Sequence, residues 1–239
     1  MSGAIRPPWI DKEDFYHMPF NYCDRWCEKC QLTNLCRVFK REEESKKKWV
    51  KAGKDPDSWD YVFNTIKESF EEVRGLIKKD ANRLGIDLSA IDYSKEKGEP
   101  LPKNFTIYRL SNKFAQAIKR TLKDLEGIPV DVDEDLVVRS AEILSYYSTL
   151  IPAKVYRAIL SRAEEKEDPK LAEACPDSRN SAFIIVNALS EIIYSLTEVI
   201  GHSPLRPIRE KLFHLRKVAI NLKEAINAEF EVEEEERLN

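Results

Sequence analysis

The sequence predicts an all-α protein, an antiparallel bundle of about five to six long helices with an irregular N-terminal cap. Three observations favour this class. Glycine is scarce, with 7 residues in 239, whereas sheet proteins with many tight turns need more. Charged residues make up 34% of the chain, above the roughly 25% of an ordinary domain, which suits solvated helical faces. Apolar residues also recur every three or four positions over long stretches, as in amphipathic helices.

The first helices are delimited by capping residues. A polar helix is expected over residues 34–50, and Gly53 ends it. The next helix begins at Asp55 and Pro56, an N-cap residue followed by proline at the first helical position. Gly85 stands where a glycine ends a helix. The apolar positions of this helix form one stripe, made of Trp59, Phe63, Ile66, Phe70, Val73, Ile77 and Leu84.

The second half of the chain contains the remaining helices. Residues 104–125 form one helix and residues 133–151 another, which Pro152 is expected to break or kink before a further helix follows. Residues 177–200 are apolar on nearly all sides, so this helix should be central in the bundle. The last helix is expected to begin at Ser203.

Composition divides the chain into three parts. These are an aromatic-rich N-terminal arm with clustered cysteines (residues 1–53), a helical bundle (54–230) and an acidic tail (231–239). The net charge of −3 gives no whole face that attracts nucleic acid, so a nucleic-acid partner is not expected. No run of about 18 apolar residues is free of charge, and residues 1–9 lack the apolar core of a signal peptide. We therefore expect a cytoplasmic protein without a membrane partner.

Four of the five cysteines lie within fourteen residues, with the spacing C-x3-C-x2-C-x5-C. Thiols stay reduced in the cytosol, so clustered cysteines there are more often metal ligands than disulfides. Four thiolates are a common ligand set of zinc and of iron–sulfur clusters. We therefore predict one metal-binding site made of Cys23, Cys27, Cys30 and Cys36. The fifth cysteine, Cys175, stands alone and is interpreted as an ordinary thiol.

Residues 27–36 contain the pattern C-x2-C-x5-C. This run resembles the cluster-binding motif in SPASM extensions of radical-SAM enzymes and the C-terminal motif of RecB-like exonucleases, including CRISPR-associated ones. Both bind a 4Fe–4S cluster with a fourth cysteine from elsewhere, so the resemblance implies such a cluster here, with Cys23 as the fourth ligand. It covers ten residues and implies nothing about the rest of the fold. Zinc is the alternative cofactor, because compact four-cysteine zinc lobes exist.

A second pattern overlaps the first. Cys23, Cys27 and Cys30 also spell C-x3-C-x2-C, the cluster signature of radical-SAM enzymes. Those enzymes leave one iron without a cysteine ligand, whereas Cys36 is close enough in this sequence to bind the fourth iron. They also use an α/β barrel, and no barrel strands are evident here. Four cysteine ligands saturate either a zinc ion or the four irons of a cluster, so neither cofactor keeps an open position for a substrate.

The predicted function is therefore electron transfer or redox sensing by an iron–sulfur protein, with a protein partner that would be a redox partner. The alternative is a zinc-stabilised helical interaction module, and a homo-oligomer is compatible with either. If the cluster passes electrons, the charged residues beside it would form a docking rim. This rim consists of Asp24, Arg25, Glu28 and Lys29.

Two histidines offer alternative interpretations. His17 lies six residues before Cys23 and could replace a cysteine ligand. Arg209 and His214 fit R-x4-H, which resembles the pattern of HEPN-type RNases, themselves helical bundles. In that family the arginine and histidine act on the phosphate and 2′-hydroxyl of RNA. Six residues spaced in this way are common by chance, so an RNase is the least favoured interpretation.

Overall fold

The computed structural model describes residues 4–90, 101–126, 134–170, 176–201 and 203–232. Every named element in these ranges is a helix, which confirms the all-α class. The extended backbone contributes one isolated antiparallel bridge, between Ala4 and Cys23. Cys175, His202 and residues 233–239 of the predicted acidic tail lie outside the described residues.

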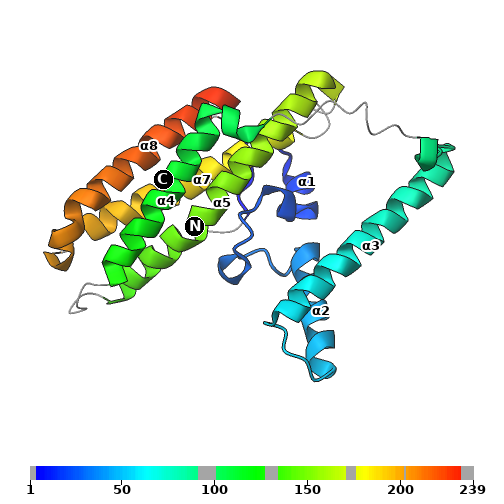
Figure 1. The fold of residues 1–239 in the computed structure, drawn as a ribbon, viewed down its shortest axis with the longest axis horizontal. Coiled ribbons are helices and arrows are strands. Elements are labelled where there is room, and N and C mark those ends of the chain that lie inside the picture. Colours follow the sequence, from blue (N-terminus) through cyan, green and yellow to red (C-terminus); the bar gives the residue numbers. More distant parts are fainter. Residues whose placement is uncertain (1–3, 91–100, 127–133, 171–175, 202, 233–239) are drawn as a thin grey trace. The chain divides into compact units, whose positions relative to one another are not determined.

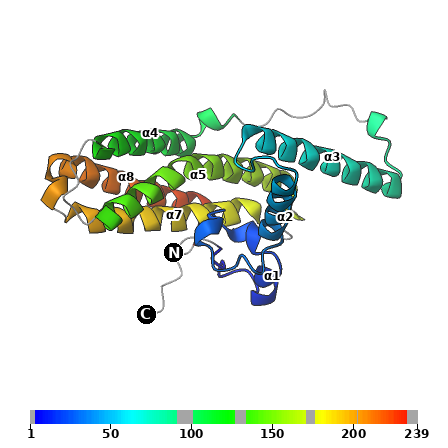
Figure 2. The same ribbon diagram turned by 90° about the horizontal axis from the view of Figure 1, so that it is seen from below.

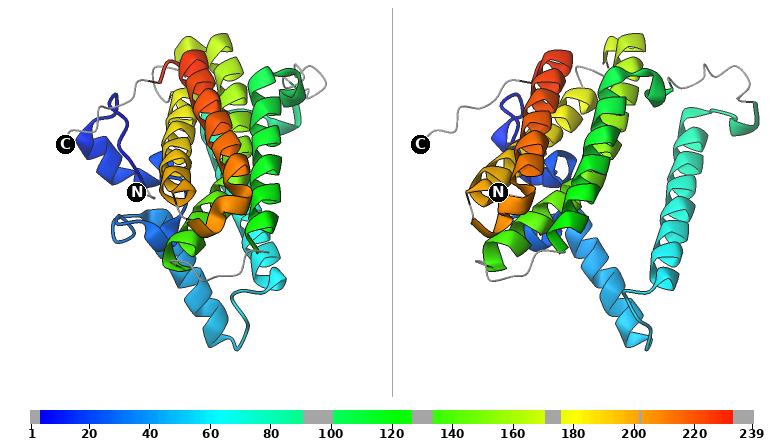
Figure 3. Two further views of the ribbon diagram at one scale, coloured as in Figure 1. Left: turned by 90° about the vertical axis from the view of Figure 1, so that its left-hand side faces the viewer. Right: turned by 60° about the vertical axis from the view of Figure 1, so that its left-hand side comes forward.

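Four long helices form a bundle in which each helix packs against two others. α4 lies beside α5 and α8, and α7 also lies beside α5 and α8. Consecutive helices run antiparallel in chain order, as Figures 1 and 3 show. A 3-10 stretch, η6 (Ser203–Ile208), leads into the last helix. The bundle helices are α4 (Thr106–Glu126), α5 (Glu134–Glu167), α7 (Asp177–Ile200) and α8 (Arg209–Phe230).

α5 is one helix of 34 residues with Pro152 inside it. The expected break at Pro152 is therefore wrong, whereas the alternative of a kink there stays a prediction. Proline removes one backbone hydrogen bond from a helix interior, but the side chains of Ile151 and Val155 on either side are fully buried in the bundle core. Burial of such aliphatic side chains contributes about 1.5–3 kcal/mol each, which offsets the local cost of the proline.

α7 is the central helix of the bundle, with 15 of its 24 residues buried. It packs against α5 and α8, and the N-terminal arm covers a further side. There the Trp9 ring meets Phe183 edge to face, with centroids 5.5 Å apart, and Trp9 Nε1 donates to Asn180 Oδ1 at 3.0 Å. By length and composition alone α7 could cross a membrane, but 61% of its most apolar window is buried, as in the core helix of a bundle.

The N-terminal arm is a chain of short helical turns. α1 (Lys12–His17) begins at Asp11, whose side chain accepts a hydrogen bond from the Glu13 amide. η1 (Pro19–Tyr22) follows, and η2 (Cys27–Lys29) lies within the cysteine segment. The amide of Ile5 donates to the carbonyl of Tyr22 at 3.4 Å, which holds the start of the arm against the first cysteine.

Residues 37–98 form a second compact unit, separate from the unit of residues 1–36 and 99–239. It contains α2 (Arg37–Lys51) and α3 (Trp59–Leu84), joined by a short turn, which can be followed in Figure 2. α3 begins after Ser58, whose hydroxyl accepts from the Tyr61 amide, and ends at Gly85 with φ 69°. This division follows compactness of the chain, whereas the boundaries at residues 53 and 230 follow composition and stay a prediction.

Candidate metal centre

The four clustered cysteines lie on one loop, residues 23–36, between η1 and α2. The loop turns sharply at its start, because Asp24 Oδ1 accepts a hydrogen bond from the Trp26 amide at 3.0 Å. Arg25 between them has a φ of 66°, in the left-handed region that few non-glycine residues adopt. The single turn of η2 then brings the amide of Cys30 within 3.2 Å of the carbonyl of Cys27.

The four thiols differ in burial. Cys23 is buried, whereas Cys27, Cys30 and Cys36 have intermediate exposure. The second half of the loop closes on itself, because the amide of Cys36 donates to the carbonyl of Leu32 at 3.0 Å. The loop therefore has an inner end at Cys23 and a partly solvated end that carries the other three cysteines.

Two of the sulfur atoms make hydrogen bonds within the loop region. The Leu32 amide donates to Cys30 Sγ at 3.4 Å, and the Cys23 thiol donates to the carbonyl of Phe20 at 3.5 Å. A backbone amide that points at a cysteine sulfur stabilises negative charge there, and such bonds tune thiolate-bound cofactors. The amide hydrogen bond therefore favours a thiolate at Cys30, whereas Cys23, which donates a hydrogen bond, is a neutral thiol.

The side chains of the four cysteines are not drawn together. In the part of the chain that the structure describes, no group of three or more His, Cys, Asp or Glu side chains is close enough to hold a metal ion. The donor set fits a thiolate-bound metal in number and chemistry, but the side-chain positions do not form the site. His17 lies exposed at the end of α1.

Asp24 anchors the inner end of the loop to α5. Its side chain is 5% exposed, and Oδ2 accepts a hydrogen bond from the Tyr147 hydroxyl at 2.8 Å. The neighbouring Tyr146 hydroxyl donates to the Asp24 carbonyl at 2.7 Å. The expected place of Asp24 on an exposed docking rim is therefore wrong, because this carboxylate is a buried structural acceptor.

Trp26 provides the apolar part of the same anchor. Its ring stacks on Tyr146, with centroids 4.3 Å apart and planes 16° from parallel, and meets Tyr147 edge to face at 5.7 Å. Lys29 Nζ lies 4.1 Å above the Trp26 ring and pairs with Glu142 at 2.7 Å. Lys29 is held by these two contacts although it remains exposed, and Arg25, Glu28 and Arg37 are the other exposed charged residues in or next to the loop.

The anchor strongly favours the neutral form of both tyrosines. Burial raises the pKa of Tyr146 and of Tyr147 far above the ordinary value of 10.0, and the nearby Asp24 carboxylate raises each further. Both hydroxyls therefore keep their protons and remain hydrogen-bond donors to Asp24 throughout the physiological range.

The basic residue Lys154 of α5 lies near Cys23. Burial raises the pKa of the Cys23 thiol, whereas Arg25 and Lys154 act in the opposite direction by favouring the thiolate. Burial also lowers the pKa of Lys154 on α5, and the nearby Cys23 partly offsets this. The inner end of the loop is therefore a weakly solvated place with a cation close to the sulfur.

A hollow of about 440 Å³ opens between the arm, the cysteine loop and α5. Lys29, Gln31 and Leu32 of the loop form part of its wall. Its other side chains combine basic and aromatic character, as in Arg6, Arg139, Phe15, Tyr16 and Trp26.

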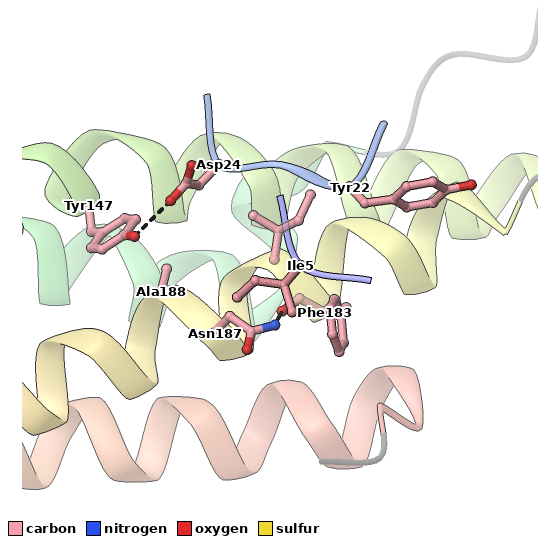
Figure 4. Close-up of a pocket in the computed structure, with 8 residues that line it drawn as sticks. Ile5, Tyr22, Asp24, Tyr147, Phe183, Asn187 and Ala188 are labelled. Atoms are coloured by element: carbon pink, nitrogen blue, oxygen red, sulfur yellow. Dashed lines mark hydrogen bonds between the residues drawn. The ribbon is translucent and has the colours of Figure 1, made fainter. Parts of the chain in front are cut away.

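A much smaller cavity, of about 10 Å³, lies behind Asp24 and is shown in Figure 4. The Asp24–Tyr147 hydrogen bond forms one wall, and Asn187, whose amide donates to the Phe183 carbonyl at 2.9 Å, forms another. This space holds at most about one water molecule. The loop thus packs closely on the bundle around Asp24, where this cavity is too small for a substrate.

The R-x4-H residues lie on α8. His214 is exposed, and Arg209 is the first residue of the helix. Five residues along an α-helix correspond to a rotation of about 140°, so the two side chains leave α8 in different directions. Helix geometry within one chain therefore does not place the side chains of Arg209 and His214 next to each other.

Comparisons with known proteins identify no relative of this chain. No protein-family model, curated protein or solved structure matches this chain.

Proposed function

We propose that this chain is an iron–sulfur protein in which Cys23, Cys27, Cys30 and Cys36 hold a 4Fe–4S cluster for electron transfer or redox sensing. The observation that carries the proposal is the placement of four cysteines, spaced C-x3-C-x2-C-x5-C, on one fourteen-residue loop. Thiolates are the ligands such clusters require, and four of them saturate all four irons.

The loop must rearrange locally to hold a cofactor, because its sulfur atoms do not converge. Cys27, Cys30 and Cys36 have intermediate exposure, so their side chains can turn without opening the bundle core. Cys23 would exchange its thiol hydrogen bond to Phe20 for a ligand bond, which requires loss of its proton. Burial raises the pKa of this thiol and opposes that loss, whereas Arg25 and Lys154 favour the thiolate.

The contacts of the arm favour a redox role over a purely structural one. Trp9, Asp24 and Trp26 already fix the arm and the inner end of the loop to α5 and α7 through hydrogen bonds and ring stacking. A metal ion is therefore not needed to hold this part of the chain on the bundle. The partly exposed half of the loop is where a cofactor would lie near the surface, as electron exchange with a partner requires.

When bound, the cluster would accept and release single electrons. The chain contributes a fixed inner end at Asp24, an aromatic wall at Trp26 that limits water, and an amide donor to Cys30 Sγ. Exclusion of water and hydrogen bonds to sulfur are two of the means by which a protein sets a cluster potential. A protein redox partner would approach the side that carries Arg25 and Glu28, in the reducing cytoplasm.

A zinc-stabilised interaction module is the second candidate. The N–H to sulfur bond at Cys30 and the compactness of the loop suit zinc as well as iron. In that case the metal would order residues 27–36, the part of the loop that carries the three partly exposed cysteines. The two candidates therefore share their ligands and differ in the metal.

Single substitutions of cysteine by serine test the ligand set. We expect Cys23→Ser, Cys27→Ser, Cys30→Ser and Cys36→Ser each to lower the metal bound per chain severalfold after anaerobic purification. Cys175→Ser is the matched control and should bind as much metal as the original chain. Retention of full metal content by all four loop variants would refute the site, and its loss in Cys175→Ser would refute the choice of ligands.

A further inference from the structure

α3 carries an apolar face that α2, the other described helix of its unit, does not cover. The side chains of Trp59, Phe63 and Phe70 are 74%, 65% and 69% exposed. Four more apolar side chains on the same face are also exposed, namely Ile66, Val73, Ile77 and Leu84. Single exposed apolar residues are ordinary, but a continuous stripe along a helix indicates a binding surface.

α2 contacts α3 through side chains on the face opposite the stripe. The Trp49 ring meets Tyr61 edge to face at 5.6 Å, and Arg41 forms an ion pair with Glu72. Tyr61 lies two residues before Phe63, which places it about 200° around the helix from the apolar stripe. The contacts with α2 therefore lie on the side of α3 away from the stripe and leave the stripe available, and Tyr61 and Ala81 are the buried residues of α3.

The stripe has the spacing of a coiled-coil seam. Its positions alternate by four and three residues, at 59, 63, 66, 70, 73, 77, 80 and 84, and seven of these eight are apolar. Such a repeat over more than three heptads is the pattern by which two helices wind around each other. Asp80 is the single polar member. With about 1.5 Å per residue, the 26 residues of α3 give a seam about 39 Å long.

We propose that α3 pairs with α3 of a second copy of this chain, antiparallel, as a two-stranded coiled coil that makes the protein a homodimer. The exposed parts of the seven apolar seam residues provide roughly 800 Å² per copy, which is the area each partner buries in a typical stable interface. The inference does not rest on the cysteines or on any bound metal.

The sizes of the seam residues favour the antiparallel direction. Aromatic residues occupy the first half of the seam, whereas the second half carries aliphatic residues and Asp80. In a parallel pair each seam residue would face the same residue of the second copy. Each aromatic ring would then meet an identical ring, and Asp80 would meet Asp80. An antiparallel pair places a large residue opposite a smaller one in most layers, which packs without voids. The layers are Trp59 with Leu84, Phe63 with Asp80, Ile66 with Ile77, and Phe70 with Val73.

The charge of α3 favours the same direction. Residues 59–72 contain four acidic side chains and one basic, a net charge of −3. Residues 73–84 contain four basic side chains and one acidic, a net charge of +3. In an antiparallel pair each acidic half lies beside the basic half of the second copy, and complementary charge steers association and fixes direction.

Sedimentation of the full chain in reducing buffer tests the dimer, because the reductant removes any contribution from disulfides. We expect a dimer, and we expect Phe70→Asp at the centre of the seam to raise its dissociation constant at least about 100-fold. Phe213→Asp is the matched control, since Phe213 is also an exposed phenylalanine, 51% accessible on α8. It should leave the dimer intact, and circular dichroism should show that both variants keep their helices.

A gain-of-affinity variant tests the direction. In the antiparallel register Lys67 lies beside Arg74 of the second copy, which is the one like-charged contact at the edge of the seam. Arg74→Glu turns both such contacts into ion pairs and should tighten the dimer by about three- to tenfold. In a parallel pair Arg74 would face Ser69, and the variant would change little. A monomeric original chain, a dimer insensitive to Phe70→Asp, or no tightening in Arg74→Glu would overturn the proposal.

Discussion

At the scale of single residues, the buried carboxylate of Asp24 links the cysteine loop to the bundle. It accepts from the Trp26 amide within the loop and from the Tyr147 hydroxyl on α5. Asp24 and Tyr147 are 123 positions apart in the chain, so the sequence around the cysteines gives no sign of the partner. The sequence therefore predicts the candidate ligands, whose signal is local spacing, but assigns the neighbouring aspartate wrongly to the surface.

The Asp24 anchor predicts a measurable loss on removal of one hydroxyl group. Tyr147→Phe removes the hydrogen bond to the buried carboxylate and should lower the free energy of unfolding by about 1–3 kcal/mol. Tyr194→Phe, at a tyrosine that is 59% exposed on α7, should change it by less than about 0.5 kcal/mol. Urea unfolding followed by circular dichroism measures both. Equal effects of the two variants would show that the Tyr147 hydroxyl makes no special contribution.

The same tyrosines predict a dependence of stability on pH. Their pKa values in the folded chain lie above the ordinary 10.0, so the folded state retains protons that the unfolded chain releases. Their contribution to stability is complete below pH 10 and declines as the pH rises above it. Unfolding free energies at increasing pH in the alkaline range should therefore fall less steeply in a Tyr146→Phe, Tyr147→Phe double variant. An unchanged slope would contradict the burial of these hydroxyls.

At the scale of elements, the helices with local end signals were the most predictable. α3 ends at Gly85 as expected, because the left-handed conformation there needs only the local chain. Its start lies at Ser58, beyond the expected Asp55, because the Ser58 hydroxyl accepts from the Tyr61 amide. Pro152 shows the opposite case. Its position inside a continuous α5 depends on core packing that local sequence does not reveal.

The N-cap of α3 provides a test at this scale. Ser58→Ala removes the acceptor of the Tyr61 amide, and loss of such a cap costs about 1 kcal/mol. Hydrogen exchange in the first turn of α3 should accelerate about fivefold, the factor that corresponds to this energy. Ser89→Ala, near the end of the same unit, is the control and should not affect the first turn. Unchanged exchange at Tyr61 would show that another group caps the helix.

At the scale of the whole molecule, the N-terminal arm belongs to the core of the bundle. Trp26 is 8% exposed and is a member of the same hydrophobic cluster as Leu189 and Leu196 of α7. The expectation that α7 is apolar on nearly all sides agrees with this arrangement, because the arm covers a side of α7 that other bundle helices leave open. What the sequence could not indicate is that the covering segment is distant in the chain, since Trp9 and Asn180 are 171 positions apart.

Trp26→Ala tests whether the arm stabilises the bundle. We expect the free energy of unfolding to fall by about 3–5 kcal/mol, as for other buried tryptophans. Phe213→Ala should have a small effect, because this side chain is half exposed. If the arm were an independent cap, Trp26→Ala would leave the cooperative unfolding of the helices unchanged, and urea titrations would show equal midpoints.

The visible absorption spectrum of the full chain, purified without oxygen and analysed for metal, tests the iron–sulfur proposal most directly. The proposal predicts a brown protein with a broad visible band that bleaches on reduction, and with about four iron and four sulfide ions per chain. A colourless protein with about one zinc ion per chain would contradict the cluster and favour the structural alternative. A colourless protein that binds neither metal would contradict the assignment of the four cysteines as ligands.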